Sequence, residues 1–364
     1  MLLLSLLLIL IILCFPASAY EIPTLDESIP KEVKEYLPGE IIDNNSGTIS
    51  MDKFGSNEVL KYLFNVFKDI LKPTFAPFFT LIGIIISCSV FSNFSQISSS
   101  SAILKAYTFL SSLCLGISMA GILSDLWKTF ESLMEKLTAL MNGISISMVT
   151  VYAISGNVNE SAVSASNMTI FVAIVGNIFK YGLFPVLQIC FVFALISAIT
   201  ELSDLTSLAA TVRKTYTTVL VFIMGILTTV LSVQHVLAAK SDGMLVRGVK
   251  MAFGSFIPIV GNAIGEASRT VAAGLNALKG SLGAACMIAL AVCVIPLFVR
   301  MFVIKLSFML CSVLSDILGM KRESGFIKSC GEIINFAIAL LSSVTLVFTI
   351  NLMIFARSEA VLGV

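Results

Sequence analysis

Long apolar windows free of charge dominate the chain from residue 73 onward. A membrane crossing needs about 20 consecutive apolar residues. The windows that meet or approach this length are 73–104, 106–124, 137–159, 161–179, 181–200, 215–239, 280–299 and 333–356. The pattern predicts an all-α fold, a polytopic transmembrane helical bundle with about eight spans, within a range of six to eight. An alternative for part of it is one long helix over about 168–199, interrupted by Lys180 and kinked at Pro185.

Two basic segments, 240–250 and 321–328, bear on the number of crossings, because short cytoplasmic loops are rich in Lys and Arg. Both segments can lie in the cytoplasm only if two crossings separate them. Met301–Leu318 is the natural candidate for the second crossing, after 280–299. We then expect about eight crossings, with both ends of the mature chain outside. The Arg213-Lys214 pair would also lie outside, which argues against this arrangement.

The first 72 residues differ from the rest of the chain. Residues 1–19 resemble a secretory signal peptide, with an apolar run and an Ala-Ser-Ala cleavage motif, although no Lys or Arg precedes the run. An uncleaved anchor is the alternative. Residues 20–72 are polar and acidic, and end in a predicted amphipathic helix from Ser56. We expect this head to lie outside the cytoplasm, ahead of a membrane domain over 73–364.

The Gly-rich segment 248–283 mixes glycines, both charge signs and Pro258 between apolar stretches. Met251–Gly265 is too short for a crossing and suggests a re-entrant or interfacial segment. A helix is expected from Asn262 onward, with one polar stripe and many small residues on its surface. It either lies on the membrane surface or forms a pore-lining or subunit-contact element. The candidate pore or subunit-contact residues are Pro258, Asn262, Glu266, Arg269 and Asn276.

Four charged residues adjoin or interrupt apolar windows: Lys180, Arg300, Lys305 and Asp316. Charge inside a bilayer is costly, so such residues usually face partners or water. Arg300 and Lys305 either extend to an interface or take a pairing or pore-facing role. Asp316 is a possible partner for Lys305.

Composition agrees with a membrane protein, because 57% of residues are hydrophobic and only 12% are charged. The net charge of +1 gives no excess of basic residues of the kind that binds nucleic acid. His235 is the only histidine, and the eight cysteines stand singly, so we expect no metal site or cofactor. His235 is interpreted as a helix-packing or interfacial residue, with a proton relay as the alternative. No P-loop and no catalytic constellation occurs, so we expect a protein that is not an enzyme.

The stretch Val249-Lys-Met-Ala-Phe-Gly-Ser-Phe256-Ile-Pro258-Ile-Val-Gly261, continuing through Glu266-Ala-Ser-Arg-Thr-Val, resembles the stage III sporulation protein AE family. The loop from Leu202 and the order of signal, acidic head and spans are also similar to that family. The resemblance implies a non-enzymatic, multi-pass subunit in the mother-cell membrane around the forespore. It implies partnership with the other stage III sporulation A proteins and, indirectly, with stage II sporulation protein Q, in a channel or secretion-like complex.

Two further hypotheses remain beside this one. Broken helices near Pro258 and the charges at Lys180 and Arg300 would suit a self-sufficient secondary transporter or permease. The third hypothesis is an assembly scaffold without a pore.

Overall fold

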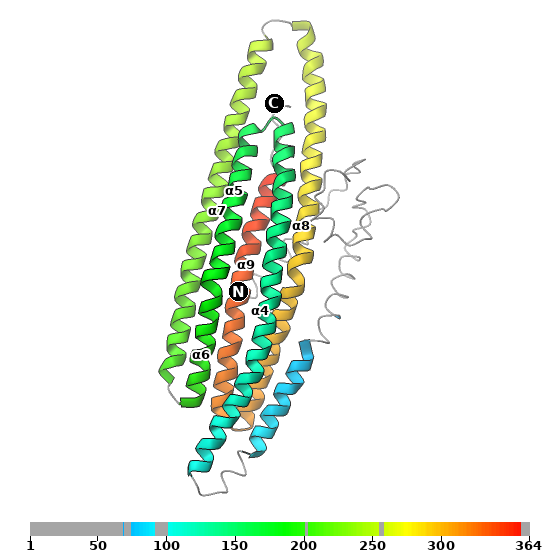
Figure 1. Ribbon diagram of the computed structural model, residues 1–364. Helices are drawn as coiled ribbons and strands as arrows, with labels where there is room; N and C mark the ends of the chain where they lie inside the picture. Colours follow the sequence, from blue (N-terminus) through cyan, green and yellow to red (C-terminus); the bar gives the residue numbers. More distant parts are fainter. Residues whose placement is uncertain (1–67, 69–73, 92–100, 201–202, 255–257, 358–364) are drawn as a thin grey trace.

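The computed structural model describes Lys68 and residues 74–91, 101–200, 203–254 and 258–357. These ranges are helical and contain no strand, as predicted. One helix spans Thr74–Phe91, and the others are α4 (Ser101–Ile154), α5 (Val158–Asn177), the π-helical η2 (Ile178–Leu183), α6 (Phe184–Thr200), α7 (Ser203–Gly254), α8 (Pro258–Ile317) and α9 (Lys321–Arg357). They run along one common axis (Figure 1). The predicted signal 1–19 and head 20–72, apart from Lys68, lie outside the described residues.

Six helices in the described ranges are long and apolar enough to cross a membrane. They are Thr74–Phe91, Phe109–Ile154, Val158–Asn177, Ser207–Met244, Ala273–Ile317 and Lys321–Ala356. Pro185–Thr200 is a shorter apolar helix. The predicted membrane helical bundle is therefore confirmed, with the number of spans at the lower end of the expected range.

Two long helices each unite segments that the sequence predicts as separate spans. Window 106–124 and most of window 137–159, up to Ile154, belong to α4, and the segment from Met301 to Ile317 continues α8 without a turn after 280–299. The predicted separate crossing at Met301–Leu318 is therefore wrong. Charged residues interrupt an apolar window without ending a helix, because Glu and Lys are good helix formers. At 1.5 Å per residue these helices are roughly 80–90 Å long, against about 30 Å for the hydrocarbon core.

The segment from Val158 to Thr200 forms one continuous rod, which confirms the single-helix alternative for this part of the chain. The rod changes to a π-helix over Ile178–Leu183, next to Pro185. Proline cannot donate a backbone hydrogen bond, and π-turns are common where a helix accommodates such a break. The hydroxyl of Tyr216 in α7 donates to the carbonyl of Ile178 at 3.3 Å, so a neighbouring helix supports the irregular turn.

Two glycines with positive φ lie in the α4–α5 and α8–α9 turns. Gly156 has a φ of 81° after α4, and Gly319 has a φ of 80° after α8. In both turns the residue after the glycine donates its N–H to a carbonyl five residues back, at 3.0 Å for Asn157 and 2.9 Å for Met320. This is the Schellman arrangement, which requires the left-handed conformation that glycine adopts readily.

The two basic segments lie at opposite ends of the bundle. Residues 240–250 belong to α7 near the α7–α8 connection, whereas 321–328 begin α9 beyond the α8–α9 turn (Figure 1). The uninterrupted α8 runs between them. If α8 crosses the membrane once, the prediction that both segments face the cytoplasm is wrong.

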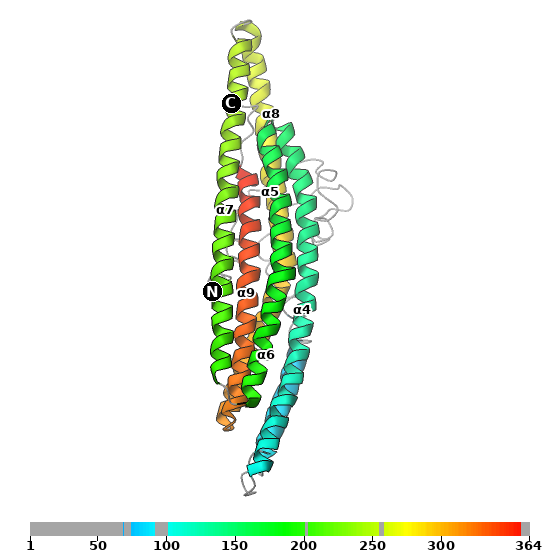
Figure 2. The same cartoon turned by 60° about the vertical axis from the view of Figure 1, so that its left-hand side comes forward.

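Helices α8 and α9 form the centre of the bundle. In their most apolar windows 76% and 78% of residues are buried, against 22% for α7. The view in Figure 2 places α7 at one edge of the bundle and α4 at the other. Aromatic pairs bring α9 against its neighbours: Phe348 contacts Phe171 of α5, Phe336 contacts Tyr216 of α7, and Phe355 contacts Tyr152 of α4, with ring centroids 4.8, 5.5 and 5.2 Å apart.

Candidate functional site

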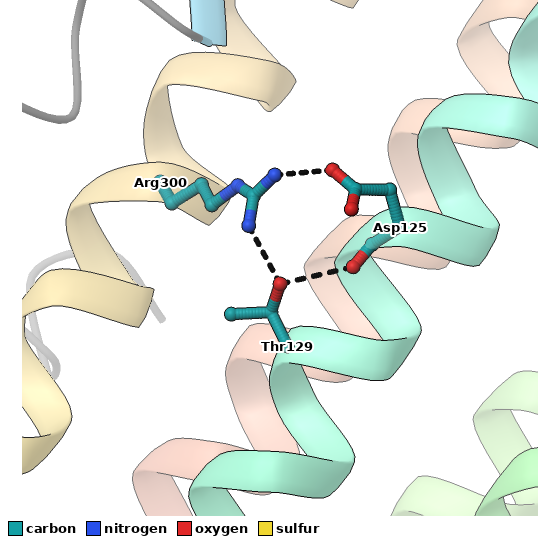
Figure 3. A network of polar contacts seen from close by, with 3 residues as sticks. All are labelled: Asp125, Thr129 and Arg300. Carbon is teal, nitrogen blue, oxygen red and sulfur yellow. Dashed lines mark hydrogen bonds and ion pairs between the residues drawn. The ribbon is translucent and has the colours of Figure 1, made fainter.

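Arg300 of α8 joins the central helix to α4 through a small polar network (Figure 3). Its guanidinium donates to the hydroxyl of Thr129 at 2.6 Å and forms an ion pair with Asp125. Thr129 in turn donates to the main-chain carbonyl of Asp125 at 2.9 Å. Of the two alternatives for Arg300, the structure shows pairing with a neighbouring helix. The fork of the guanidinium suits this, because it reaches two acceptors at once.

The other predicted intramembrane charges have different surroundings. Asp316 forms an ion pair with Lys328 of α9, with 2.8 Å between Oδ2 and Nζ, and both side chains are well exposed. Its predicted pairing with Lys305 is wrong, because both residues lie on α8, eleven residues or roughly 16 Å apart along the axis. Lys305 is half-buried and has no ion pair within the described residues. Lys180 lies in η2, where the structure describes its backbone only.

The Gly-rich segment forms the ends of two long helices. Described residues up to Gly254 complete α7, and Pro258 is the first residue of α8. Proline is tolerated there because the first helical N–H has no partner within the helix. The helix predicted from Asn262 onward is confirmed. Asn276 is exposed, whereas the side chains of Pro258, Asn262, Glu266 and Arg269 lie outside the described set.

A buried polar cluster lies where the α4–α5 turn meets α7 and α8. Asp242 of α7 is 1% exposed, and its two carboxylate oxygens accept the main-chain N–H groups of Asn159 and Glu160, each at 3.0 Å. These N–H groups belong to the first turn of α5, where no partner within the helix exists. A carboxylate at a helix N-terminus is favourable because it meets the positive end of the helix dipole. Asp242 therefore caps α5 from another helix.

Lys279 of α8 is the most unusual member of this cluster, because its side chain is fully buried. Its Nζ has no hydrogen-bond partner among the described residues, and it lies 5.2 Å from the centroid of the Tyr152 ring. It also interacts electrostatically with Glu160, which is 2% exposed and accepts a hydrogen bond from the Asn157 amide. An ammonium over an aromatic face is attracted by the ring quadrupole. The buried cation thus depends on a ring and a carboxylate from two other elements.

His235 of α7 completes the cluster. The imidazole is 4% exposed, and its ring centroid lies 6.5 Å from that of Tyr152. Its Nδ1 has no hydrogen-bond partner in the part of the chain that the structure describes. The arrangement supports the packing interpretation of His235 over the interfacial one.

The exposed face of α4 carries a row of charges near the Arg300 network. Asp125, Lys128, Glu131, Glu135 and Lys136 are all exposed, and their spacings of three, three, four and one place them on one side of the helix. We call these five residues the charged band of α4. Apart from the ion pair of Asp125, their side chains form no salt bridge or hydrogen bond with the described residues.

The comparisons with known proteins decide the family. A sequence model described as "Stage III sporulation protein AE" matches residues 33–358. The chain belongs to the stage III sporulation protein AE family. It is 29% identical over 174 residues to stage III sporulation protein AE of Bacillus subtilis (strain 168). That match covers 46% of this chain and 42% of the relative, so it spans less than half of either. No solved structure matches the chain.

Sequence reasoning found part of the polar framework of this AE-family protein and missed the rest. Arg300 was found because it interrupts an apolar window. Glu160, Lys279 and the charged band of α4 fall between the predicted apolar windows, and Asp242 falls in the basic segment 240–250, so no role was predicted for them. The signal that could have found the band is its helical spacing, since a loop has no reason to keep its charges on one face.

Proposed function

We propose that this protein is a non-enzymatic membrane subunit of a channel or secretion-like complex that links mother cell and forespore during endospore development. Membership of the stage III sporulation protein AE family is the observation that carries the proposal. The six apolar helices support a multi-pass location, which we propose to be the mother-cell membrane around the forespore. Its proposed partners are the other stage III sporulation A proteins and, indirectly, stage II sporulation protein Q.

The charges inside the bundle support a role in conduction rather than a purely structural one. Ionisable residues within membrane helices usually face water or one another and mark pathways for ions or substrates. Here Arg300 pairs across helices, and Lys279 is buried beside Glu160. A scaffold without a pore has no need to keep several charges within its apolar part.

Deletion of the gene in a spore-forming host tests the proposal. We expect the deletion strain to lose heat-resistant spores by at least a hundredfold, and a plasmid-borne copy to restore them. Normal spore formation in the deletion strain would refute the proposed role. Solute uptake by the purified protein alone in liposomes would instead favour the secondary transporter, because a subunit of a complex depends on its partners.

A further inference from the structure

The charged band of α4 lies on the outside of the bundle, at a depth where α7 is free of charge and α9 nearly so. The depth follows from a cross-helix contact at one end of the band and another sixteen residues beyond its other end. Below it, Asp125 is fixed by its ion pair with Arg300 of α8. Above it, Tyr152 of α4 contacts Phe355 of α9. The whole band lies between these two levels, because α4 is a continuous helix.

The depth of the Asp125–Arg300 contact can be located on α9 through the packing of α8 against α9. Gly283 of α8 lies directly against Ala356 of α9, since a Cβ added at Gly283 would be 2.6 Å from the Ala356 Cβ. The two helices are antiparallel, and Arg300 is seventeen residues beyond Gly283. The α9 residue at the same depth is therefore about seventeen before Ala356, near Ala339. Counted from the Tyr152–Phe355 contact instead, Asp125 is level with Lys328 of α9. By either count Glu131, Glu135 and Lys136 fall inside the charge-free stretch 333–356 of α9.

Helix α7 is also free of charge at the depth of the charged band. Tyr216 contacts Phe336 of α9, and His235 is close to Tyr152 of α4. Between these two residues α7 contains no charge, and its outer face exposes large apolar side chains. They include Val219, Phe222, Ile226, Val230 and Val233. Two surfaces at one depth thus differ completely: α7 is suited to lipid, and α4 is not.

Lipid is an unfavourable environment for the exposed face of α4. Lys128, Glu131, Glu135 and Lys136 have no counter-charge on another described helix. Unpaired charges within membrane segments face water or a polar partner, because hydrocarbon cannot solvate them. A dry contact with another subunit would leave four charges to be matched one by one. Water solvates all of them without any such requirement.

We propose that the charged band of α4 lines a water-filled path through the membrane, closed on its other side by neighbouring subunits. The inference rests on the proposed function, which supplies those subunits. With Arg300 included, the residues that line this path are three acids (Asp125, Glu131, Glu135) and three bases (Lys128, Lys136, Arg300). The balance disfavours strong selection for ions of one sign. It suits hydrated polar solutes that carry both charges or none.

Cysteine labelling in membranes from sporulating cells tests this path with the complete chain. The band is probed by Lys128→Cys, Glu131→Cys and Glu135→Cys. Phe222→Cys, Ile226→Cys and Val230→Cys on α7 are matched controls, because they are exposed at the same depth. All variants carry Cys114→Ser, which removes an exposed native thiol. A charged, water-soluble methanethiosulfonate is the probe, and labelling in denaturant confirms that each thiol is present and reactive.

We expect the three band cysteines to react at least tenfold faster than the three α7 cysteines. Equal, fast labelling of both sets would overturn the inference, because this part of the bundle would then lie outside the bilayer. Slow labelling of both sets would also overturn it, because the band would be covered by a dry contact. Spore counts of the unlabelled strains report the proposed function separately. A deletion strain that cannot sporulate, together with unreactive band cysteines, would remove the path and leave the proposed function standing.

Discussion

At the scale of single residues, Lys279 and Glu160 are two buried side chains of opposite charge beside the α4–α5 turn. A buried charge left without its counter-charge is strongly unfavourable, whereas removing both charges together can be nearly neutral. Lys279 is fully buried and is stabilised only by the ring of Tyr152 and by the carboxylate of Glu160 within the described residues. The sequence did not reveal this pair, because the two residues are 119 positions apart and each lies at the edge of an apolar window.

The variant Lys279→Met tests whether the stability of the fold depends on both charges being present together. We expect Lys279→Met and Glu160→Gln each to lower the free energy of unfolding by about 1–3 kcal/mol, because each leaves a buried charged group without its nearby opposite charge. The double variant should recover part of the loss. The measurement is the thermal unfolding midpoint of the purified protein in detergent. Lys214→Met, at an exposed position of α7, is the control and should change little. Additive losses in the double variant would show that the two charges do not interact.

At the scale of helices, apolar windows located the membrane segments but not the ends of the elements. Alternation of apolar and charged stretches resembles spans and loops, yet Asp125 to Lys136 continues one helix, because nothing in that stretch breaks it. True ends occur where backbone chemistry requires them, at Gly156 and Gly319. The cap of α5 comes from Asp242 on another helix, which no local pattern around Asn157 could indicate.

Asp242→Ala should loosen the start of α5. The change leaves the main-chain N–H groups of Asn159 and Glu160 without their acceptors, at a cost of about 1–3 kcal/mol. Hydrogen–deuterium exchange measured by mass spectrometry should show faster exchange in the peptide that contains these two residues. Asp242→Asn keeps one acceptor oxygen and should give an intermediate rate. Unchanged exchange in Asp242→Ala would contradict the assigned cap.

At the scale of the whole molecule, the class of fold followed from the sequence and the topology did not. Hydrophobic windows are sufficient to predict a membrane bundle. The number of crossings between the two basic segments depended on whether the chain turns near Arg300. The ion pair with Asp125 shows why no turn is needed there: the charge is accommodated by α4 instead of by water at a loop.

We expect the two basic segments to lie on opposite faces of the membrane, and labelling of cysteines at exposed positions can test this. Ser241→Cys lies near the α7–α8 end of the bundle, and Lys321→Cys begins α9 at the other end. When the chain is expressed in the plasma membrane of vegetative cells, a membrane-impermeant maleimide should label only one of them in intact protoplasts, and both after permeabilisation. Labelling of both, or of neither, in intact protoplasts would show that the segments share a face.

The ion pair between Asp125 and Arg300 connects the charges of the apolar helices to the proposed sporulation function. The most direct test is the count of heat-resistant spores in strains that carry Asp125→Arg, Arg300→Asp, or both exchanges together, with protein levels checked by immunoblotting. We expect at least a tenfold loss in each single strain, because each exchange places two like charges side by side. It predicts substantial recovery in the double strain, where the ion pair is re-formed with its partners reversed. Full spore formation in both single strains, at normal protein levels, would contradict the claim.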